Sequence, residues 1–109
     1  MRDNREFQRI DVSIPCLVYC DDLVITGDIT NLSLGGAFIS QASDTLTEGL
    51  PVFLRLQSKQ DIKSKVIIGS RIIHSSQEVG GEDQINSFGV KFEESLSEVS
   101  DKLAFILHE

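Results

Sequence analysis

The sequence predicts a mainly β protein: a six-stranded antiparallel β-barrel with a C-terminal α-helix. Three observations indicate this fold. Short apolar runs rich in β-branched residues recur with turn residues between them. Only the last apolar run, within residues 96–106, changes to helical spacing. A chain of 109 residues holds one modest core, and a closed barrel buries that core without long exposed strand edges.

The first three strands are expected at 12–19, 23–30 and 37–40. Pro15 lacks an amide donor and indicates a sheet edge or a bulge in the first strand. Between the second and third strands, Asn31–Gly36 (NLSLGG) has the composition of a turn. Residues 41–50 are mostly polar and are expected to form a loop.

The remaining strands are expected at 52–57, 66–74 and 87–92. Val52, Leu54 and Leu56 alternate with other residues and therefore share one face of their strand. Gly69 and the serine after it predict a bulge in the fifth strand. Residues 75–84 (SSQEVGGEDQ) predict a flexible hairpin loop.

The helix at the end of the chain is predicted from apolar spacing and from a cap. The apolar residues that recur at helical intervals are Leu96, Val99, Leu103 and Ile106. Ser95 and Glu98 form a capping-box pattern at the start of this segment. The phenylalanines are expected to pack mainly in the core, with Phe7 as the exception.

The overall charge limits the classes of function. A net charge of −7 argues against general nucleic-acid binding, which needs a basic face. No apolar stretch approaches the roughly 20 residues that a membrane helix needs, and no secretory signal is seen, so a cytoplasmic protein without membrane insertion is expected. Three of the five arginines fall in residues 1–9.

Cysteine, histidine and acidic residues suggest no catalytic or metal site. Cys16 and Cys20 lie about 13 Å apart if they share a strand, which is too far for a disulfide, and are expected to be core thiols. His74 and His108 have no neighbours at metal-ligand spacing. We therefore expect no enzyme and no metal. Arg71 either lines a ligand site or pairs with an acid, and the pair is favoured.

Arg5 and Arg9 form an R-x-x-x-R pair ahead of the first strand. A separation of four residues puts both side chains on one face. Each guanidinium matches a phosphate and also the O6 and N7 edge of guanine. The alternative is that both are surface arginines paired with Glu6 and Asp11.

The turn carries matching chemistry. Its glycines, Gly36 among them, permit close approach to the backbone, and successive amides there can form an anion-binding concavity. Asn31 brings an amide and Ser33 a hydroxyl. The alternative is again ordinary, because Asn, Ser and Gly are the usual residues of any turn.

Taken together, Arg5 and Arg9 followed by the N-x-S-x-x-G pattern of Asn31, Ser33 and Gly36 resemble the signature of the PilZ domain family. The segments GGAFIS, PVFLRL, VIIGSRIIH and SFGVKF also resemble PilZ positions, so the likeness covers roughly residues 5–107. The resemblance implies a six-stranded barrel with a helix and a receptor for cyclic di-GMP. It also implies that the two arginines grip phosphates and guanine edges, that Asn31 and Ser33 bind the ligand, and that Gly36 shapes the turn.

The resemblance further implies a division of the chain and a mode of signalling. Residues 1–10 are expected to be a flexible arm that orders on ligand binding, and residues 11–109 the barrel domain with its helix. The output is expected to be contact with an unidentified downstream protein in motility, biofilm formation or surface attachment, from a monomer or weak dimer. The alternative is a degenerate adaptor that binds proteins without nucleotide. Asn4 stands where many members have a further arginine, which leaves open whether one or two ligand molecules bind.

Overall fold

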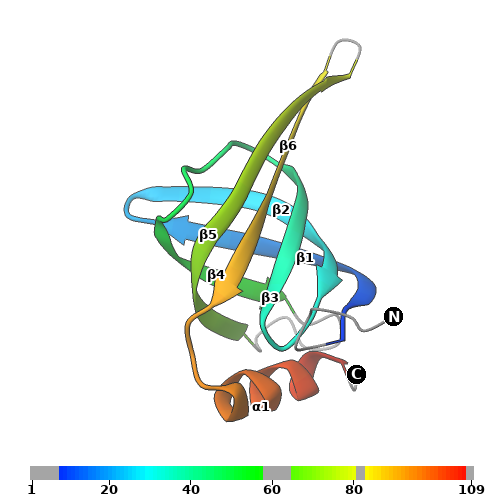
Figure 1. Ribbon diagram of the computed structural model, residues 1–109, viewed down its shortest axis with the longest axis vertical. Coiled ribbons are helices and arrows are strands. Elements are labelled where there is room, and N and C mark those ends of the chain that lie inside the picture. Colours follow the sequence, from blue (N-terminus) through cyan, green and yellow to red (C-terminus); the bar gives the residue numbers. More distant parts are fainter. Residues whose placement is uncertain (1–7, 58–64, 81–82, 108–109) are drawn as a thin grey trace, which may run out of the picture.

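Six antiparallel strands form a closed barrel, and one helix lies across one end of it (Figure 1). This computed structural model describes residues 8–57, 65–80 and 83–107. The mainly β fold class and the C-terminal helix are therefore confirmed. In the described part of the chain, no helix is long and apolar enough to cross a membrane.

The strands follow one another around the barrel in the order β1-β2-β3-β6-β5-β4. The elements are β1 (Ile10–Cys20), β2 (Leu23–Leu32), β3 (Gly36–Ala42), β4 (Pro51–Gln57), β5 (Lys65–Gly80), β6 (Asp83–Phe92) and α1 (Leu96–Leu107). Pairings of β1 with β4 and of β3 with β6 join strands that are distant in the sequence and close the barrel.

The core consists of the inward-facing residues of all six strands and one face of α1. Val99 and Leu103 of the helix are buried against the barrel. Cys16 belongs to this core, where burial, with Asp28 nearby, raises the pKa of its thiol to about 12. Cys16 and Cys20 are both free thiols, as expected. Pro15 lies just outside the paired stretch of β1 and β4, which begins at Cys16.

The expectation of a flexible loop over residues 75–84 is wrong. β5 continues to Gly80 and β6 starts at Asp83, so this polar segment forms a long two-stranded hairpin that extends beyond the barrel (Figure 1). Pairing between the two strands overrides the low strand propensity of Ser, Gln, Glu and Gly, because propensity in sheets depends strongly on neighbours.

The bulge expected at Gly69 is also displaced. Pairing of β4 with β5 is regular from Lys65 to Arg71, and the register shift lies further on, between Ile72 and His74 where β5 meets β6. Gly69 instead contacts the segment that leads into α1: its amide donates to Glu94 Oε2 at 2.6 Å.

Two phenylalanines expected in the core face outward. Phe53 is 60% exposed and Phe38 is 38% exposed, whereas Phe88 and Phe92 are buried as expected. Strand alternation explains the difference, because the neighbours of Phe53 and Phe38 point inward and a strand turns successive side chains to opposite faces. These inward neighbours are Val52, Leu54, Ala37 and Ile39.

Candidate functional site

A cavity of about 310 Å³ lies on the outer surface of the barrel, over β3 and β6, and four of the five residues of the sequence signature line it. These four are Arg9, Asn31, Ser33 and Gly36. Arg5 lies outside the described residues. Strand pairing explains the convergence, since Ile10 and Asp11 pair with Leu32 and Asn31, and one further step places Arg9 beside the turn.

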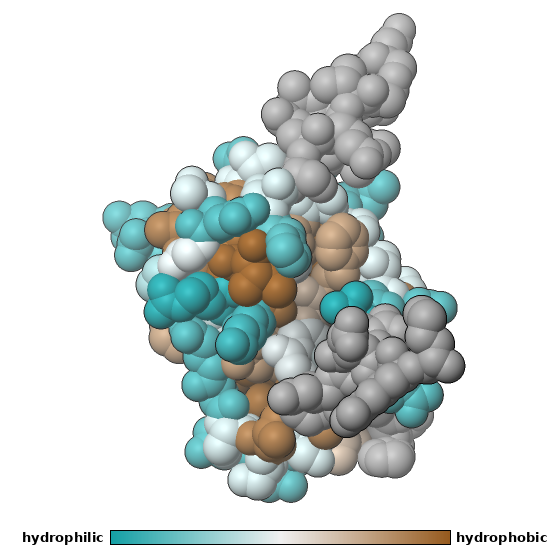
Figure 2. Space-filling model, in the orientation of Figure 1, coloured by the Kyte–Doolittle hydropathy of each residue, from teal (hydrophilic) through white to brown (hydrophobic). Residues whose placement is uncertain are grey.

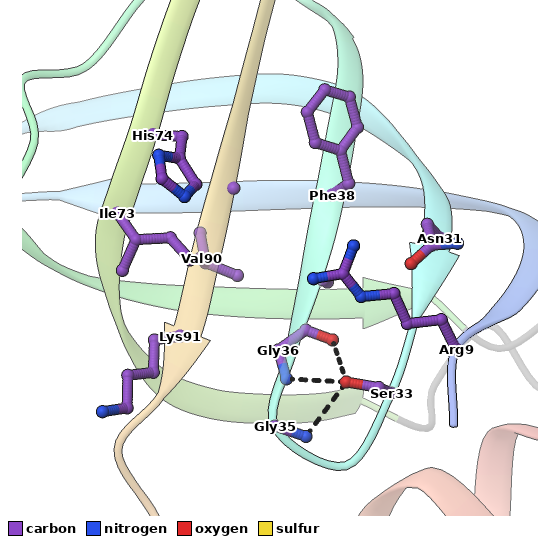
Figure 3. A pocket seen from close by; sticks show the side chains of 12 residues that line it. Arg9, Asn31, Ser33, Gly35, Gly36, Phe38, Ile73, His74, Val90 and Lys91 are labelled. Carbon is purple, nitrogen blue, oxygen red and sulfur yellow. Dashed lines mark hydrogen bonds between the residues drawn. The ribbon is translucent and has the colours of Figure 1, made fainter. Parts of the chain in front are cut away.

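The turn between β2 and β3 is held by one side chain. The Ser33 hydroxyl accepts hydrogen bonds from the Gly35 and Gly36 amides at 3.1 and 3.2 Å (Figure 3). The Ser33 backbone amide donates to the Gly36 carbonyl at 2.9 Å. Both glycine amides are thus occupied, so the expected amide concavity for an anion is not formed. The hydroxyl hydrogen has only one long contact, since Ser33 Oγ lies 3.4 Å from the Gly36 carbonyl oxygen. This hydrogen is the donor that the turn leaves for a ligand.

Gly36 sits where β3 lies tightly against β6. A Cβ built on Gly36 would lie 2.2 Å from the carbonyl oxygen of Val90, the residue that precedes its cross-strand partner Lys91. No side chain fits at that distance, so a residue other than glycine forces the two strands apart. Gly36 thus allows β3 to pack closely against β6 at the edge of the cavity that it lines.

Asn31 is half-buried at the end of β2. Its Nδ2 lies 3.4 Å from Asp11 Oδ1, which is a long and therefore weak hydrogen bond. Because this hydrogen bond is weak, the Asn31 amide can give it up for a stronger partner in the cavity.

The other side of the cavity comes from β3, β5 and β6 and was not foreseen from the sequence. The bulge in β5 puts two successive residues, Ile73 and His74, opposite the single Gly89, and both are exposed. Gly89 also pairs with Phe38. Because Gly89 has no side chain, a hollow remains between the Phe38 ring and the imidazole (Figure 3).

Apolar side chains are exposed on this face. Figure 2 shows an apolar patch there, bordered by hydrophilic side chains. Among the residues that line the cavity, Phe38 and Ile73 are the large exposed hydrophobic ones. The cavity thus combines an apolar wall with a polar wall, an arrangement typical of small-molecule sites.

The described cations divide into two groups. Arg55 Nη1 donates to the Tyr19 hydroxyl at 2.9 Å, Arg71 pairs with Glu93 at 3.2 Å, and Lys102 pairs with Glu94. The pair favoured for Arg71 is thus confirmed. Within the described residues, two cationic side chains have no such partner and line the same cavity. They are Arg9 and Lys91.

The geometry supports binding. The polar wall supplies amide and hydroxyl groups and two cations, which suit an anion, and the apolar wall suits a flat ring. Among the described residues, no three His, Cys, Asp or Glu side chains form a group that could hold a metal ion.

Solved structures with the same fold include three of direct interest. The PilZ domain of YcgR from Escherichia coli, determined with c-di-GMP, has a TM-score of 0.75 at 16% identity, over 97% of this chain and 91% of that one. The PilZ domain of CeSA from a cellulose-synthesizing bacterium has a TM-score of 0.64 at 21% identity, over 93% and 96% of the two chains. The motility inhibitor MotI of Bacillus subtilis has a TM-score of 0.73 at 12% identity; this chain is covered to 98% and spans about half, 51%, of MotI.

At these identities the likeness concerns the fold. No curated protein matches the sequence. The sequence itself shows the family, since the sequence model of the PilZ domain matches residues 3–107, almost the whole chain. The chain belongs to the PilZ domain family.

Proposed function

We propose that this protein is a receptor for cyclic di-GMP that signals to another protein. The observation that carries the proposal is the convergence of Arg9 with Asn31 and Ser33 on one cavity of a PilZ barrel. Two distant structural relatives, the YcgR domain and MrkH of K. pneumonia, were determined with c-di-GMP, which supports the same class of ligand here.

Each part of the ligand has a matching group in the site. Arg9 offers a planar fork of donors to a phosphate or to a guanine edge. Asn31 and the Ser33 hydroxyl hydrogen offer hydrogen bonds to base, sugar or phosphate. Phe38 provides a ring surface beside which a purine base packs. Arg5 would join from the segment before Arg9.

Binding would also order the part of the arm that precedes β1, since Ile10 already pairs with Leu32. Fixing a segment costs conformational entropy, and charge-assisted hydrogen bonds from two arginines to the phosphates offset that cost at about 1.5–3 kcal/mol each. The repositioned arm would then change the surface offered to a downstream protein. A receptor needs no chemical step, and we assign no catalytic residue.

The test is isothermal titration with cyclic di-GMP at fixed salt. Arg9→Ala should weaken binding about tenfold to a hundredfold, since it removes one charge-assisted contact. Arg5→Ala/Arg9→Ala should abolish measurable binding. Arg55→Ala is the matched control, because Arg55 contacts Tyr19 on β1 and does not line the cavity.

The titration also separates the alternatives. Equal affinity of wild type and both arginine variants would overturn the assigned site. Absence of binding to wild type would remove the receptor proposal and leave an adaptor that binds proteins without nucleotide. The molar ratio at saturation gives one ligand molecule or two.

A further inference from the structure

We propose that Lys91 on β6 is a further ligand-binding residue, one that contributes a second cation to the cyclic di-GMP site from the barrel itself. This inference rests on the function proposed above. No part of the five-residue sequence signature includes Lys91, which follows the G-V pair near the end of β6.

Cross-strand register places Lys91 at the cavity. It pairs with Gly36 of β3 on one side and with Arg71 of β5 on the other. Because Gly36 has no side chain, Lys91 meets no side chain at its register position on β3. Lys91 lines the cavity together with Arg9, although its ammonium is directed away from Arg9 in Figure 3.

The charge of Lys91 is not neutralised by its neighbours. Glu93, two residues further on, is engaged elsewhere, because its carboxylate accepts from Arg71 Nε at 3.2 Å. Within residues 8–57, 65–80 and 83–107, no hydrogen bond or ion pair engages the Lys91 ammonium. An exposed cation without a counterion is thus held beside a cavity in a protein of net charge −7.

The ligand chemistry fits two cations of different kinds. Cyclic di-GMP carries two phosphodiester anions, and Arg9 precedes the first strand whereas Lys91 belongs to a paired strand. A lysine acts as a flexible point charge that needs no fixed geometry, so rotation about its side-chain bonds lets the ammonium turn toward a phosphate. Its contribution is therefore electrostatic and decreases as salt screens it.

The experiment measures cyclic di-GMP affinity of Lys91→Gln and Lys91→Arg by titration at about 50 mM and about 500 mM salt. We expect Lys91→Gln to weaken binding about threefold to tenfold at low salt, as for a partly solvated charge, and much less at high salt. Lys91→Arg should keep wild-type affinity, since it keeps the charge. Arg55→Gln removes one positive charge at a residue outside the cavity and should leave the affinity unchanged.

Each outcome decides one point. Equal affinity of Lys91→Gln and wild type at low salt, with Arg9→Ala still impaired, would overturn the role of Lys91 and leave the receptor intact. An equal loss in Lys91→Gln and Arg55→Gln would overturn it too, because net charge alone would then explain the effect. Absence of wild-type binding would remove the proposed function itself.

Discussion

At the scale of single residues, some residues at the turn between β2 and β3 hold its backbone in place, and others are available to contact a ligand. The Ser33 hydroxyl oxygen accepts hydrogen bonds from the amides of both Gly35 and Gly36, so Ser33 stabilises the turn to which it belongs. Gly36 allows β3 to approach Val90. Asn31 and Arg9 have no strong partner among the described residues and are available to a ligand. Loss of ligand affinity in a Ser33 or Gly36 variant could therefore come from a distorted cavity wall as well as from a lost contact with the ligand.

Gly36→Ala should destabilise the fold. The added Cβ would lie 2.2 Å from the Val90 carbonyl oxygen, so the strands must shift, at a cost of about 1–3 kcal/mol in the free energy of unfolding. Urea denaturation measures this cost. Gly69→Ala is the matched control: its Cβ would meet its nearest atom, Glu94 Oε2, at 3.7 Å, an ordinary contact, and should cost less than about 0.5 kcal/mol. Equal stability of Gly36→Ala and wild type would contradict the close approach.

At the scale of elements, one carboxylate joins α1 to the barrel. Glu94 Oε2 accepts from the Gly69 amide on β5, and Glu94 Oε1 accepts from Lys102 of α1 at 2.5 Å. Lys102 also donates to the Ile67 carbonyl at 2.7 Å. The segment after β6, the strand β5 and the helix therefore share one polar junction, next to the apolar contacts of Val99 and Leu103.

This junction makes stability depend on pH. Burial acts to raise the pKa of Glu94, but hydrogen bonds from Lys102 and the Gly69 amide outweigh it and hold the pKa below its ordinary value of 4.5. A carboxylate with a lowered pKa stabilises the fold above its unfolded-state pKa, and that contribution is lost as pH falls through the folded-state pKa. Glu94→Gln should lower the urea midpoint at pH 7 and flatten its decline below about pH 4.5.

Glu48→Gln is the control for that measurement, because Glu48 is an exposed carboxylate in the loop before β4. It should reproduce the wild-type dependence on pH. A wild-type decline retained in full by Glu94→Gln would place the acid sensitivity elsewhere in the protein.

At the scale of the whole molecule, the barrel and its helix were predictable and the composition of the cavity was not. Apolar alternation, turn residues and the cap at Ser95 are local patterns, and they sufficed for six strands and one helix. Cross-strand register and a bulge are what bring three further residues to the cavity that the turn lines: Lys91, His74 and Ile73. Neither can be read from residues near in sequence, because a one-residue shift turns every side chain to the opposite face. The sequence did not predict the long hairpin for a related reason, because its polar strands are stabilised by pairing with each other and not by an apolar pattern.

Binding should stabilise the whole barrel, since a ligand that binds only the folded state raises the free energy of unfolding. At cyclic di-GMP a hundred times above its dissociation constant, the gain is about 2.7 kcal/mol, or roughly 10–20 °C in Tm for a domain of this size. Calorimetry suits the measurement, because the sequence contains no tryptophan. Arg5→Ala/Arg9→Ala should show no rise with ligand. A similar rise in that variant would contradict binding through the arginines.

The closing of the barrel has a consequence for how the protein folds. Four of the six strand pairings join neighbours along the chain, whereas β1 with β4 and β3 with β6 join distant segments and carry the larger loop-closure entropy. The cavity straddles the second of these seams, where Gly36 faces Lys91. β6 is the last strand along the chain, so the two walls of the cavity come together only when this strand has paired with β3. The cavity therefore requires the completed barrel, and under the proposed function only a fully folded molecule would bind cyclic di-GMP.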